Sequence, residues 1–506
     1  MFKAIATKKE TFKKQIVFFV SLFITLIILA IGIIDQELMT KYVSWAYNGI
    51  LNNFGWIYML SAIFFLVFAI GLSFSRFGNI KLGKDHEKPQ YSYFGWFSML
   101  FAAGMGIGLI FWGVSEPLVH YLEPPEHIQN ASKDAASFGM RYSFFHWGLQ
   151  PWAIYIIMSL SIAYFSFRRE MPPLISSCFY PLLGDSIYRT PGYIIDILAV
   201  LATIFGVATS LGLGATQIHT GLSYLYGLSE GFNITLIIIL IATVLYMLSS
   251  IVGLDKGIQA LSKLNMFVAL LLMTFLLIVG PTTYILNIFT STIGTYTNRL
   301  LEMSLDSSPF IGYEWIQSWT LFYWAWWISW SPFVGLFVAR ISRGRTIKEF
   351  IHGVLIVPTL LTFLWFSVFG GTGFKLQFTQ GINLAEIAQK DASLALFHMF
   401  EAIPLGSLLS AISLILLFVF FITSADSATF VLGILSSNGS MNPSLTKKVT
   451  WGASQSGIAL ILLWVGGIQA LQKMAITAAL PFSIIMLLLC YNLYSALCEE
   501  DKYFKI

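Results

Sequence analysis

Charged residues are scarce in this chain. Of its 506 residues, only 11% are Asp, Glu, Lys or Arg, whereas 57% are hydrophobic. Soluble proteins carry a charge on about a quarter of their residues, so the composition excludes an ordinary soluble globular protein. The net charge of +4 does not indicate a nucleic-acid partner, because the basic residues are concentrated in particular loops.

Cysteine and histidine are also sparse. The three cysteines, Cys178, Cys490 and Cys498, form neither a disulfide framework nor a zinc-binding spacing. The seven histidines are scattered along the chain, which argues against a metal enzyme, and no cofactor is expected. A cleavable signal peptide is not expected either. The first apolar run is longer than a signal-peptide core, and no small-residue cleavage site follows it.

Long apolar runs are the main feature of the sequence. Each is about 20 residues long, which is enough to cross a bilayer as a helix. The pattern predicts an all-α integral membrane protein with 12 transmembrane helices, at residues 16–34, 56–75, 93–113, 144–166, 191–217, 234–253, 265–288, 319–339, 351–370, 405–424, 449–469 and 475–496.

The basic residues indicate the orientation of these helices. With the N-terminus in the cytoplasm, 22 of the 29 lysines and arginines lie on the cytoplasmic side and 7 lie outside. The opposite orientation violates the positive-inside rule. We therefore expect a multi-pass protein of the bacterial inner (cytoplasmic) membrane with both termini in the cytoplasm.

The predicted spans divide the chain into six segments. An amphipathic interfacial helix is expected before the eighth span, where apolar and acidic residues are mixed. The proline-containing outer loop at 114–143 is expected to form an ordered cap. The segments are a cytoplasmic tail (1–15), two peripheral N-terminal spans (16–90), a first five-helix unit (91–290), the interfacial helix (291–318), a second five-helix unit (319–497) and a short cytoplasmic tail (498–506).

Two of the predicted spans contain helix breakers at membrane depth. Gly104, Gly106 and Gly108 stand on alternate residues of the third span. In the eighth, Pro332 forfeits a backbone bond, and the two neighbouring serines can cap the gap. Non-helical backbone inside a membrane is buried in protein or lines a cavity. The two breaks lie five spans apart, as in carriers built from inverted repeats that bind substrate at broken helices. Close helix packing is the alternative for the glycines. A dinucleotide-binding loop is disfavoured, because Leu109 stands where that motif needs glycine.

Aromatic side chains form a second pattern. Five fall within eight residues of the eighth span, and three more lie in the fourth. An interfacial tryptophan belt is the alternative, but it does not explain four tryptophans beside a helix break. Ring faces attract a cation that cannot donate hydrogen bonds, such as trimethylammonium, by about 2 kcal/mol per ring when desolvated. The residues are Tyr323, Trp324, Trp326, Trp327, Trp330, Trp147, Trp152 and Tyr155.

Acidic residues are missing from the middle of these same spans. A zwitterion without net charge therefore suits the rings better than a lone cation. Its carboxylate would need backbone donors, such as those freed around residues 104–108.

Adjacent hydroxyl groups form a third pattern. Thr423 and Ser424 lie near the end of the tenth span, where two hydroxyls and the carbonyls of an unwound helix would suit Na⁺. The alternative is that both hydroxyls bond to their own helix. Asp426 follows them and either caps the helix or pairs with Arg340 at an inner gate. Glu116 is placed near the outer end of the third span, with no role assigned.

Together these residues resemble the betaine/choline/carnitine transporter (BCCT) family. The strongest match is the stretch YWAWWISWSPFVGLFVARISRGR at 323–345, with further matches at 101–108, 146–155, 255–257 and 423–426. The resemblance runs through all the predicted spans. It implies a LeuT-like 5+5 inverted repeat with two extra N-terminal helices, usually assembled as a homotrimer in the lipid bilayer. It also implies Na⁺-coupled import of a small quaternary-ammonium osmolyte by alternating access.

The resemblance implies particular site residues as well. The substrate site would comprise an aromatic box of Trp147, Trp152, Tyr155 and Trp327, flanked by Trp326, Trp330, Gly104, Met105, Gly106 and Gly108. The main Na⁺ site would comprise backbone carbonyls of Ala102, Met105 and Phe420 and the hydroxyls of Thr423 and Ser424. A second Na⁺ site would involve Thr203 and Phe333, but Val207 stands where the family pattern has a threonine and removes a hydroxyl ligand.

Two features narrow the expected activity. The glycine-rich stretch favours Na⁺ coupling, because relatives that exchange carnitine without sodium lack it. Gly108 favours glycine betaine over choline, since choline transporters tend to carry aspartate there. Choline, carnitine, proline betaine, ectoine and dimethylsulfoniopropionate stay as alternative substrates. The short tail 498–506 is not the long basic extension with which some relatives sense osmotic strength.

Two other classes of protein fit the pattern less well. A channel would need a continuous polar pore, and a membrane enzyme would need a nucleophile–base pair or a metal cluster at depth. The sequence pattern indicates neither.

Overall fold

The computed structural model describes residues 15–503 except 105, 230, 253–254 and 311–312; for 101–104, 252, 255–260 and 501–503 it describes the backbone alone. Within these residues the chain is helical, and its single β-type contact is an isolated bridge between Lys81 and Thr346. The helices are α2 (Ile16–Ile34), α3 (Gln36–Phe74), η1 (Arg76–Asn79), α4 (Tyr93–Gly104), α5 (Ile107–Leu122), α6 (Lys133–Trp147), α7 (Leu149–Ala163), η2 (Tyr164–Arg168), η3 (Ser176–Phe179), α8 (Tyr180–Leu183), η4 (Gly184–Tyr188), α9 (Thr190–Tyr226), α10 (Phe232–Val252), α11 (Asp255–Val279), α12 (Thr282–Asn298), α13 (Leu300–Leu305), α14 (Tyr313–Ile316), η5 (Gln317–Leu321), α15 (Phe322–Ile341), α16 (Ile347–Thr379), α17 (Leu384–Lys390), α18 (Ala395–Glu401), α19 (Gly406–Leu435) and α20 (Leu445–Tyr503).

Ten helical segments in the described part of the chain are long and apolar enough to cross a membrane. The first coincides with the predicted span at 16–34. Two regions prevent a simple count: the third predicted span is divided into α4 and α5, and α20 covers both of the last two predicted spans. Within α20, Gly466 and Gly467 have non-helical backbone angles, which marks the division that the sequence predicts there. The 12-helix count and the inverted repeat stay predictions.

Burial separates central from peripheral helices. In the most apolar window of Lys133–Arg168 and of Tyr313–Ile341, 94% of the residues are buried, against 28% in α2 and 33% in α10. Large apolar side chains such as Phe23, Val67 and Val244 are exposed on the peripheral helices, as expected of surfaces that face hydrocarbon. Helices α6, α7 and α15 therefore form the centre of the protein.

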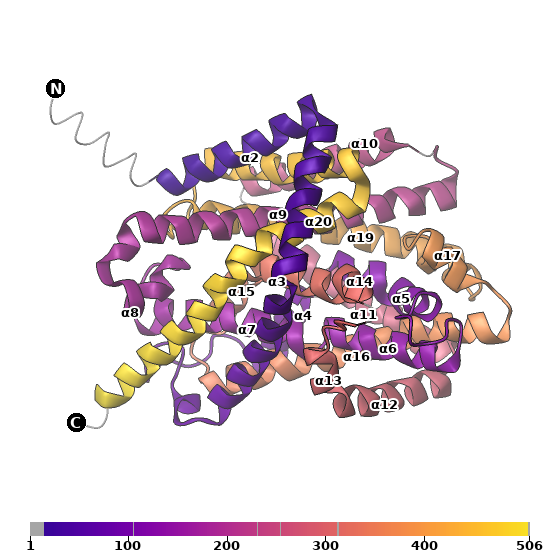
Figure 1. The fold of residues 1–506 in the computed structure, drawn as a ribbon, viewed down its shortest axis with the longest axis horizontal. Coiled ribbons are helices and arrows are strands. Elements are labelled where there is room, and N and C mark those ends of the chain that lie inside the picture. Colours follow the sequence, from indigo (N-terminus) through magenta and orange to yellow (C-terminus); the bar gives the residue numbers. More distant parts are fainter. Residues whose placement is uncertain (1–14, 105, 230, 253–254, 311–312, 504–506) are drawn as a thin grey trace.

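Figure 1 shows α3 crossing the face of the molecule steeply, with α20 running diagonally beside it. The two helices also pack on each other in the residue contacts. The start of α2, the end of α20 and helix α8 lie on the left of this view, and α17 lies on the right.

Two connections differ from the prediction. The expected cap at 114–143 is mostly helix: α5 continues to Leu122 with Pro117 inside it, and α6 starts after Ser132, whose hydroxyl accepts the Ala135 N–H at 3.1 Å. The span predicted at 265–288 ends earlier, at Val279. Pro281 lacks an N–H and directly precedes a new helix, α12. This helix overlaps the start of the interfacial helix predicted at 291–318, and the described remainder of that segment contains the short helices α13 and α14 and the start of η5.

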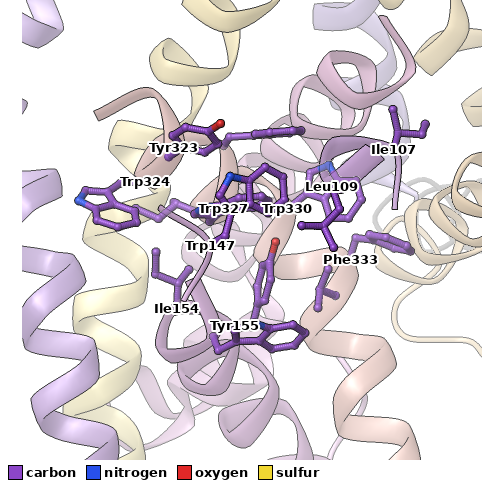
Figure 2. Close-up of a cluster of buried hydrophobic side chains, with 14 of the residues drawn as sticks. Ile107, Leu109, Trp147, Ile154, Tyr155, Tyr323, Trp324, Trp327, Trp330 and Phe333 are labelled. Carbon is purple, nitrogen blue, oxygen red and sulfur yellow. The ribbon is translucent and has the colours of Figure 1, made fainter. Parts of the chain in front are cut away.

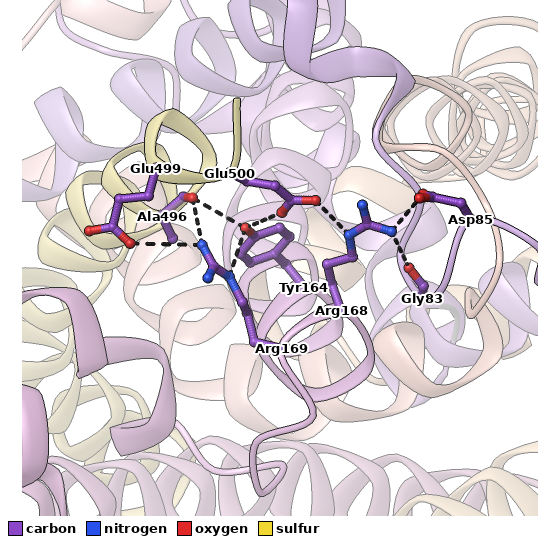
Figure 3. Close-up of polar contacts among 8 residues, drawn as sticks. All are labelled: Gly83, Asp85, Tyr164, Arg168, Arg169, Ala496, Glu499 and Glu500. Carbon is purple, nitrogen blue, oxygen red and sulfur yellow. Dashed lines mark hydrogen bonds and ion pairs between the residues drawn. The ribbon is translucent and has the colours of Figure 1, made fainter. Parts of the chain in front are cut away.

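A network of charged groups ties the C-terminal part of α20 to η2 and the loop before α4 (Figure 3). Arg168 donates to Glu500 Oε1 at 2.6 Å and to Asp85 Oδ1 at 2.6 Å, while Tyr164 donates to Glu500 Oε2 at 2.5 Å. Nearby, the Arg343 guanidinium donates to Glu87 and holds the pKa of that carboxyl below its ordinary value. These contacts clamp three segments that are far apart in sequence.

Candidate functional site

The first predicted helix break is confirmed. Helix α4 ends at Gly104 and α5 begins at Ile107, with Gly106 in a non-helical conformation (φ −151°, ψ −147°). The start of α5 leaves backbone N–H groups without partners in the helix. Of the residues predicted here, Met105 lies outside the described residues, and Ala102 and Gly104 belong to α4 with only their backbone described.

The second predicted break, in the eighth span, is wrong. Helix α15 continues through Pro332 from Phe322 to Ile341. Proline cannot donate to the carbonyl four residues earlier, that of Ile328. The Ser331 hydroxyl donates to this same carbonyl at 2.7 Å and so replaces the missing bond. The irregularity lies one turn before α15, where η5 forms a π-helical turn.

The four rings of the predicted box form one chain of contacts. Trp147 meets Trp327 edge-to-face with centroids 4.9 Å apart, Trp327 meets Tyr155 at 6.2 Å, and Tyr155 meets Trp152 at 5.6 Å. Trp326 stacks on Trp327 at 4.8 Å with an interplanar angle of 14°. Figure 2 shows Trp147, Trp327 and Trp330 close together with Tyr155 beneath them. The rings come from α6, α7 and α15, the central helices.

A small cavity lies beside these rings, at the break between α4 and α5. The side chains pack so closely that little empty space remains between the rings. Trp152 and Tyr155 are not part of the lining. The lining residues are Gly106, Ile107, Gly108, Trp147, Ser210, Trp326, Trp327, Trp330 and Ser424.

Gly108 is placed where only glycine fits. A Cβ atom at this position would lie 2.6 Å from the Trp147 ring and 3.0 Å from the Trp326 ring. Any side chain would therefore push the rings apart. Gly106 differs, because a Cβ there would meet no atom of the described residues within 4 Å.

Several polar atoms around the cavity have no hydrogen-bond partner. Among the lining residues these are Trp326 Nε1, Trp330 Nε1 and Ser210 Oγ, and Tyr155 Oη lies below them. Buried donors are nearly always paired in folded proteins, so donors left free at a cavity are available to a ligand. By contrast, the indole nitrogen of Trp327 donates to the His146 carbonyl at 2.9 Å. The cavity thus offers ring faces and free hydrogen-bond donors together.

Glu116 is the important residue that the sequence analysis missed. Its fully buried carboxylate accepts hydrogen bonds at Oε2 from Trp147 Nε1 (2.8 Å) and from the Tyr323 hydroxyl (2.6 Å). Its other oxygen lies 2.8 Å from His146 Nδ1. A signal was present: Gly108, Trp112 and Glu116 follow at intervals of four, so a helix that continues past residue 113 places them near one face.

Of the residues predicted for the main Na⁺ site, Phe420, Thr423 and Ser424 lie in the middle of α19, not near the end of a span, and the helix is not unwound there. The Thr423 hydroxyl donates to the Val419 carbonyl at 2.9 Å and lies 3.4 Å from the Phe420 carbonyl. Ser424 lines the cavity. The Thr423 hydroxyl and the Phe420 carbonyl therefore lie close together, and Ser424 is one of the residues that line the cavity.

The residues predicted for a second Na⁺ site are occupied by other contacts. The buried Thr203 hydroxyl donates to the carbonyl of Ala199 in its own helix at 2.8 Å. Val207 is buried. Phe333 packs edge-to-face on Trp330, with centroids 5.4 Å apart. None of these contacts supplies an oxygen atom that could replace the threonine hydroxyl missing at position 207.

Comparison with known proteins identifies the family. The model of BCCT, the betaine/carnitine/choline family of transporters, matches residues 16–502. The chain belongs to this family. A BCCT protein is a transporter and not an enzyme, and the helical structure agrees with a multi-pass membrane protein.

Three BCCT relatives are similar over most of their length. The glycine betaine transporter OpuD of Bacillus subtilis (strain 168) is 49% identical, over 97% of this chain and 95% of the relative. An ectoine/hydroxyectoine transporter of Virgibacillus pantothenticus is 40% identical, over 96% and 97%. A glycine betaine/proline/choline/ectoine transporter of Vibrio parahaemolyticus serotype O3:K6 (strain RIMD 2210633) is 40% identical, over 90% and 81%.

Proposed function

We propose that this BCCT protein is a Na⁺-coupled symporter that imports a quaternary-ammonium compatible solute, with glycine betaine as its substrate. The observation that carries the proposal is the cavity that combines tryptophan faces with three free donors, Trp326 Nε1, Trp330 Nε1 and Ser210 Oγ. A trimethylammonium group is attracted to ring faces. A carboxylate is the acceptor that such donors require. Glycine betaine carries both groups on one small molecule.

Charge favours a zwitterion over choline. None of the residues lining the cavity is acidic. The Glu116 carboxylate lies behind Trp147 and already accepts from Trp147 and Tyr323. A lone cation would therefore enter without a counter-charge. Carnitine, ectoine, proline betaine and dimethylsulfoniopropionate also carry both charges, and the names of two relatives include ectoine.

Alternating access would require the rings to separate. Trp147 of α6 meets Trp327 of α15 with centroids 4.9 Å apart, and both line the cavity, so a substrate enters only if α15 moves relative to α6. The break between α4 and α5 supplies backbone that can bend. We further propose that one Na⁺ binds at Thr423, Ser424 and the carbonyls of Phe420, Ala102 and Met105. In this proposal the protein is a homotrimer of the bacterial inner membrane with both termini in the cytoplasm.

Uptake into proteoliposomes tests the proposal. Purified protein should accumulate labelled glycine betaine when an inward Na⁺ gradient is imposed, and not with K⁺ in its place. Unlabelled ectoine, carnitine and choline, added as competitors, rank the alternative substrates. Uptake that is equal with and without Na⁺ would contradict symport, and stronger competition by choline than by betaine would contradict the choice of a zwitterion.

A matched pair of variants tests the ring site itself. Trp327→Leu removes a ring that lines the cavity, so betaine affinity should fall by about 1–2 kcal/mol, roughly 5- to 30-fold. Trp324→Leu removes an equally buried ring from the same helix that is not part of the lining. It should leave affinity unchanged in the folded protein. Equal effects of the two substitutions on binding would contradict the site.

A further inference from the structure

Three metal-binding side chains meet behind the ring cluster. Glu116, His120 and His146 are fully buried, and one ligand atom from each lies within 4.8 Å of the others. Glu116 Oε1 is 2.8 Å from His146 Nδ1 and 3.4 Å from His120 Nε2. The two histidines come from different helices, α5 and α6, and are brought together only by the fold.

His120 has little polar contact for a buried imidazole. Its Nε2 approaches the Glu116 carboxylate at 3.4 Å, but among the described residues neither ring nitrogen forms a regular hydrogen bond. Its ring packs against Trp319 at 4.4 Å and Trp315 at 4.9 Å between centroids, and against Phe138 at 6.2 Å. Burying a polar group without a partner is costly. A phenylalanine or leucine would fill this apolar space at lower cost, and the long contact to Glu116 offsets little of it, so the imidazole points to a ligand shared with that carboxylate.

We propose that Glu116, His120 and His146 form a binding site for a divalent cation of the zinc type. Two imidazoles and one carboxylate are a donor set that Zn²⁺ accepts, with a fourth position left open. Bonds of about 2.0–2.2 Å in a tetrahedral site place ligand atoms roughly 3.3–3.5 Å apart. The Glu116–His120 separation is already 3.4 Å. The Glu116–His146 contact needs to open by about half an ångström, and the ligand nitrogens of His120 and His146, which lie within 4.8 Å of each other, must reach the same spacing.

The surroundings orient one of these ligands. The second ring nitrogen of His146 is hydrogen-bonded to Thr320 Oγ1 at 3.0 Å. A partner of this kind commonly fixes the ring of a metal-binding histidine. Trp315 and Trp319, which cover His120, are partly exposed. The site therefore lies one layer of rings below the surface, within reach of an ion from solution.

The metal site is joined directly to the rings. Glu116 Oε2 accepts from Trp147 and Tyr323, and the His146 carbonyl accepts from Trp327. A cation held by Glu116 and His146 would fix the groups that position two rings of the box. If those rings must separate for transport, Zn²⁺ bound here inhibits uptake. This consequence rests on the proposed function, whereas metal binding does not.

Zinc titration of tag-free, metal-stripped protein in detergent tests the site. We expect one Zn²⁺ per chain in the wild type. His120→Gln should weaken binding by about 100-fold, since losing a ligand costs at least as much as losing a partner behind it. His398→Gln is the matched control, because His398 also lies beside a glutamate, 3.6 Å from Glu401, but near the surface. Equal Zn²⁺ binding by wild type and His120→Gln, or none by the wild type, would overturn the proposal.

X-ray absorption at the zinc edge of the wild type covers the case in which His120→Gln does not fold. The spectrum should contain two imidazoles and light-atom ligands. A spectrum without imidazole would overturn the site. In proteoliposomes, external Zn²⁺ should slow betaine uptake by the wild type and His398→Gln but not by His120→Gln. Zinc-insensitive uptake by protein that binds Zn²⁺ would overturn the coupling between the metal and the rings.

Discussion

The indole nitrogen of Trp147 donates a hydrogen bond to Glu116 Oε2 over 2.8 Å. The same helix, α5, carries Gly108, which lies close to the six-membered ring of Trp147. One helix therefore contacts this side chain both at its six-membered ring and at its indole N–H. A ring held in this way is oriented before a substrate arrives, which lowers the entropy lost on binding.

Glu116→Gln should weaken substrate binding without removing any ring. The amide keeps one acceptor oxygen but loses the charge, and hydrogen bonds to charged groups contribute about 1 kcal/mol more than neutral ones. We expect betaine affinity to fall about fivefold, measured by tryptophan fluorescence or calorimetry. Glu123→Gln is the control, because the exposed Glu123 bonds to Gln389 far from the rings. Unchanged affinity in Glu116→Gln would show that the carboxylate does not position Trp147.

Gly108→Ala and Gly106→Ala form a second matched pair. The added Cβ at position 108 would lie 2.6 Å from Trp147, whereas at position 106 it would meet nothing within 4 Å. Overpacking costs about 1–3 kcal/mol, so Gly108→Ala should reduce betaine affinity about tenfold or more. Gly106→Ala should change it less than about threefold. If both alanines are tolerated equally, the rings beside Gly108 are free to move and the site is less rigid than the packing indicates.

Structural features that depend on neighbouring residues in the chain were predicted correctly from the sequence. The bounds of α2 follow from the length of an apolar run, and the division between α4 and α5 follows from alternate glycines. The expected break at Pro332 was wrong. The sequence indicated that a serine can cap the gap, but not that the Ser331 hydroxyl bonds to the carbonyl that Pro332 leaves free and keeps α15 continuous. Glu116 and His146, 30 residues apart, could not be paired from sequence, because their contact depends on how α5 packs on α6.

Arg168→Met should destabilise the fold rather than alter the substrate site. Arg168 bonds to Glu500 and Asp85, and its side chain is only 12% exposed. Losing a charge-assisted contact of this kind costs about 2 kcal/mol. The melting temperature in detergent should therefore fall, with betaine affinity unchanged. Lys84→Met is the control, since the Lys84–Glu170 pair is 55% and 66% exposed and such pairs contribute about 0–1 kcal/mol. Equal melting temperatures for the two variants would show that the clamp at the end of α20 contributes no stability.

Thr423→Ala/Ser424→Ala should raise the Na⁺ concentration for half-maximal uptake about tenfold or abolish transport in folded protein. The Thr423 hydroxyl donates to Val419, yet a hydroxyl keeps acceptor lone pairs while it donates. Its 3.4 Å separation from the Phe420 carbonyl is one that a cation can bridge, given cation–oxygen distances of about 2.4 Å as for Ca²⁺. Ser413→Ala, on the same helix, is the control, because the buried Ser413 hydroxyl has no partner to lose. If the double variant and Ser413→Ala need the same Na⁺ concentration for half-maximal uptake, the proposed Na⁺ site is contradicted.

The number of Na⁺ ions transported per substrate is the sharpest test of coupling. The expected number depends on Val207, which removes a ligand from the second Na⁺ site. Without a hydroxyl at 207, and with Thr203 bonded to its own helix, we expect one Na⁺ per substrate and a first-order dependence of uptake on Na⁺. Thr209 is a poor replacement, because its hydroxyl already contacts the carbonyls of Phe205 and Leu471 at 2.9 and 3.2 Å. Parallel uptake of ²²Na⁺ and labelled betaine measures the ratio. A ratio of two would mean that other oxygen atoms complete the second site, and Val207→Thr would then leave the ratio unchanged.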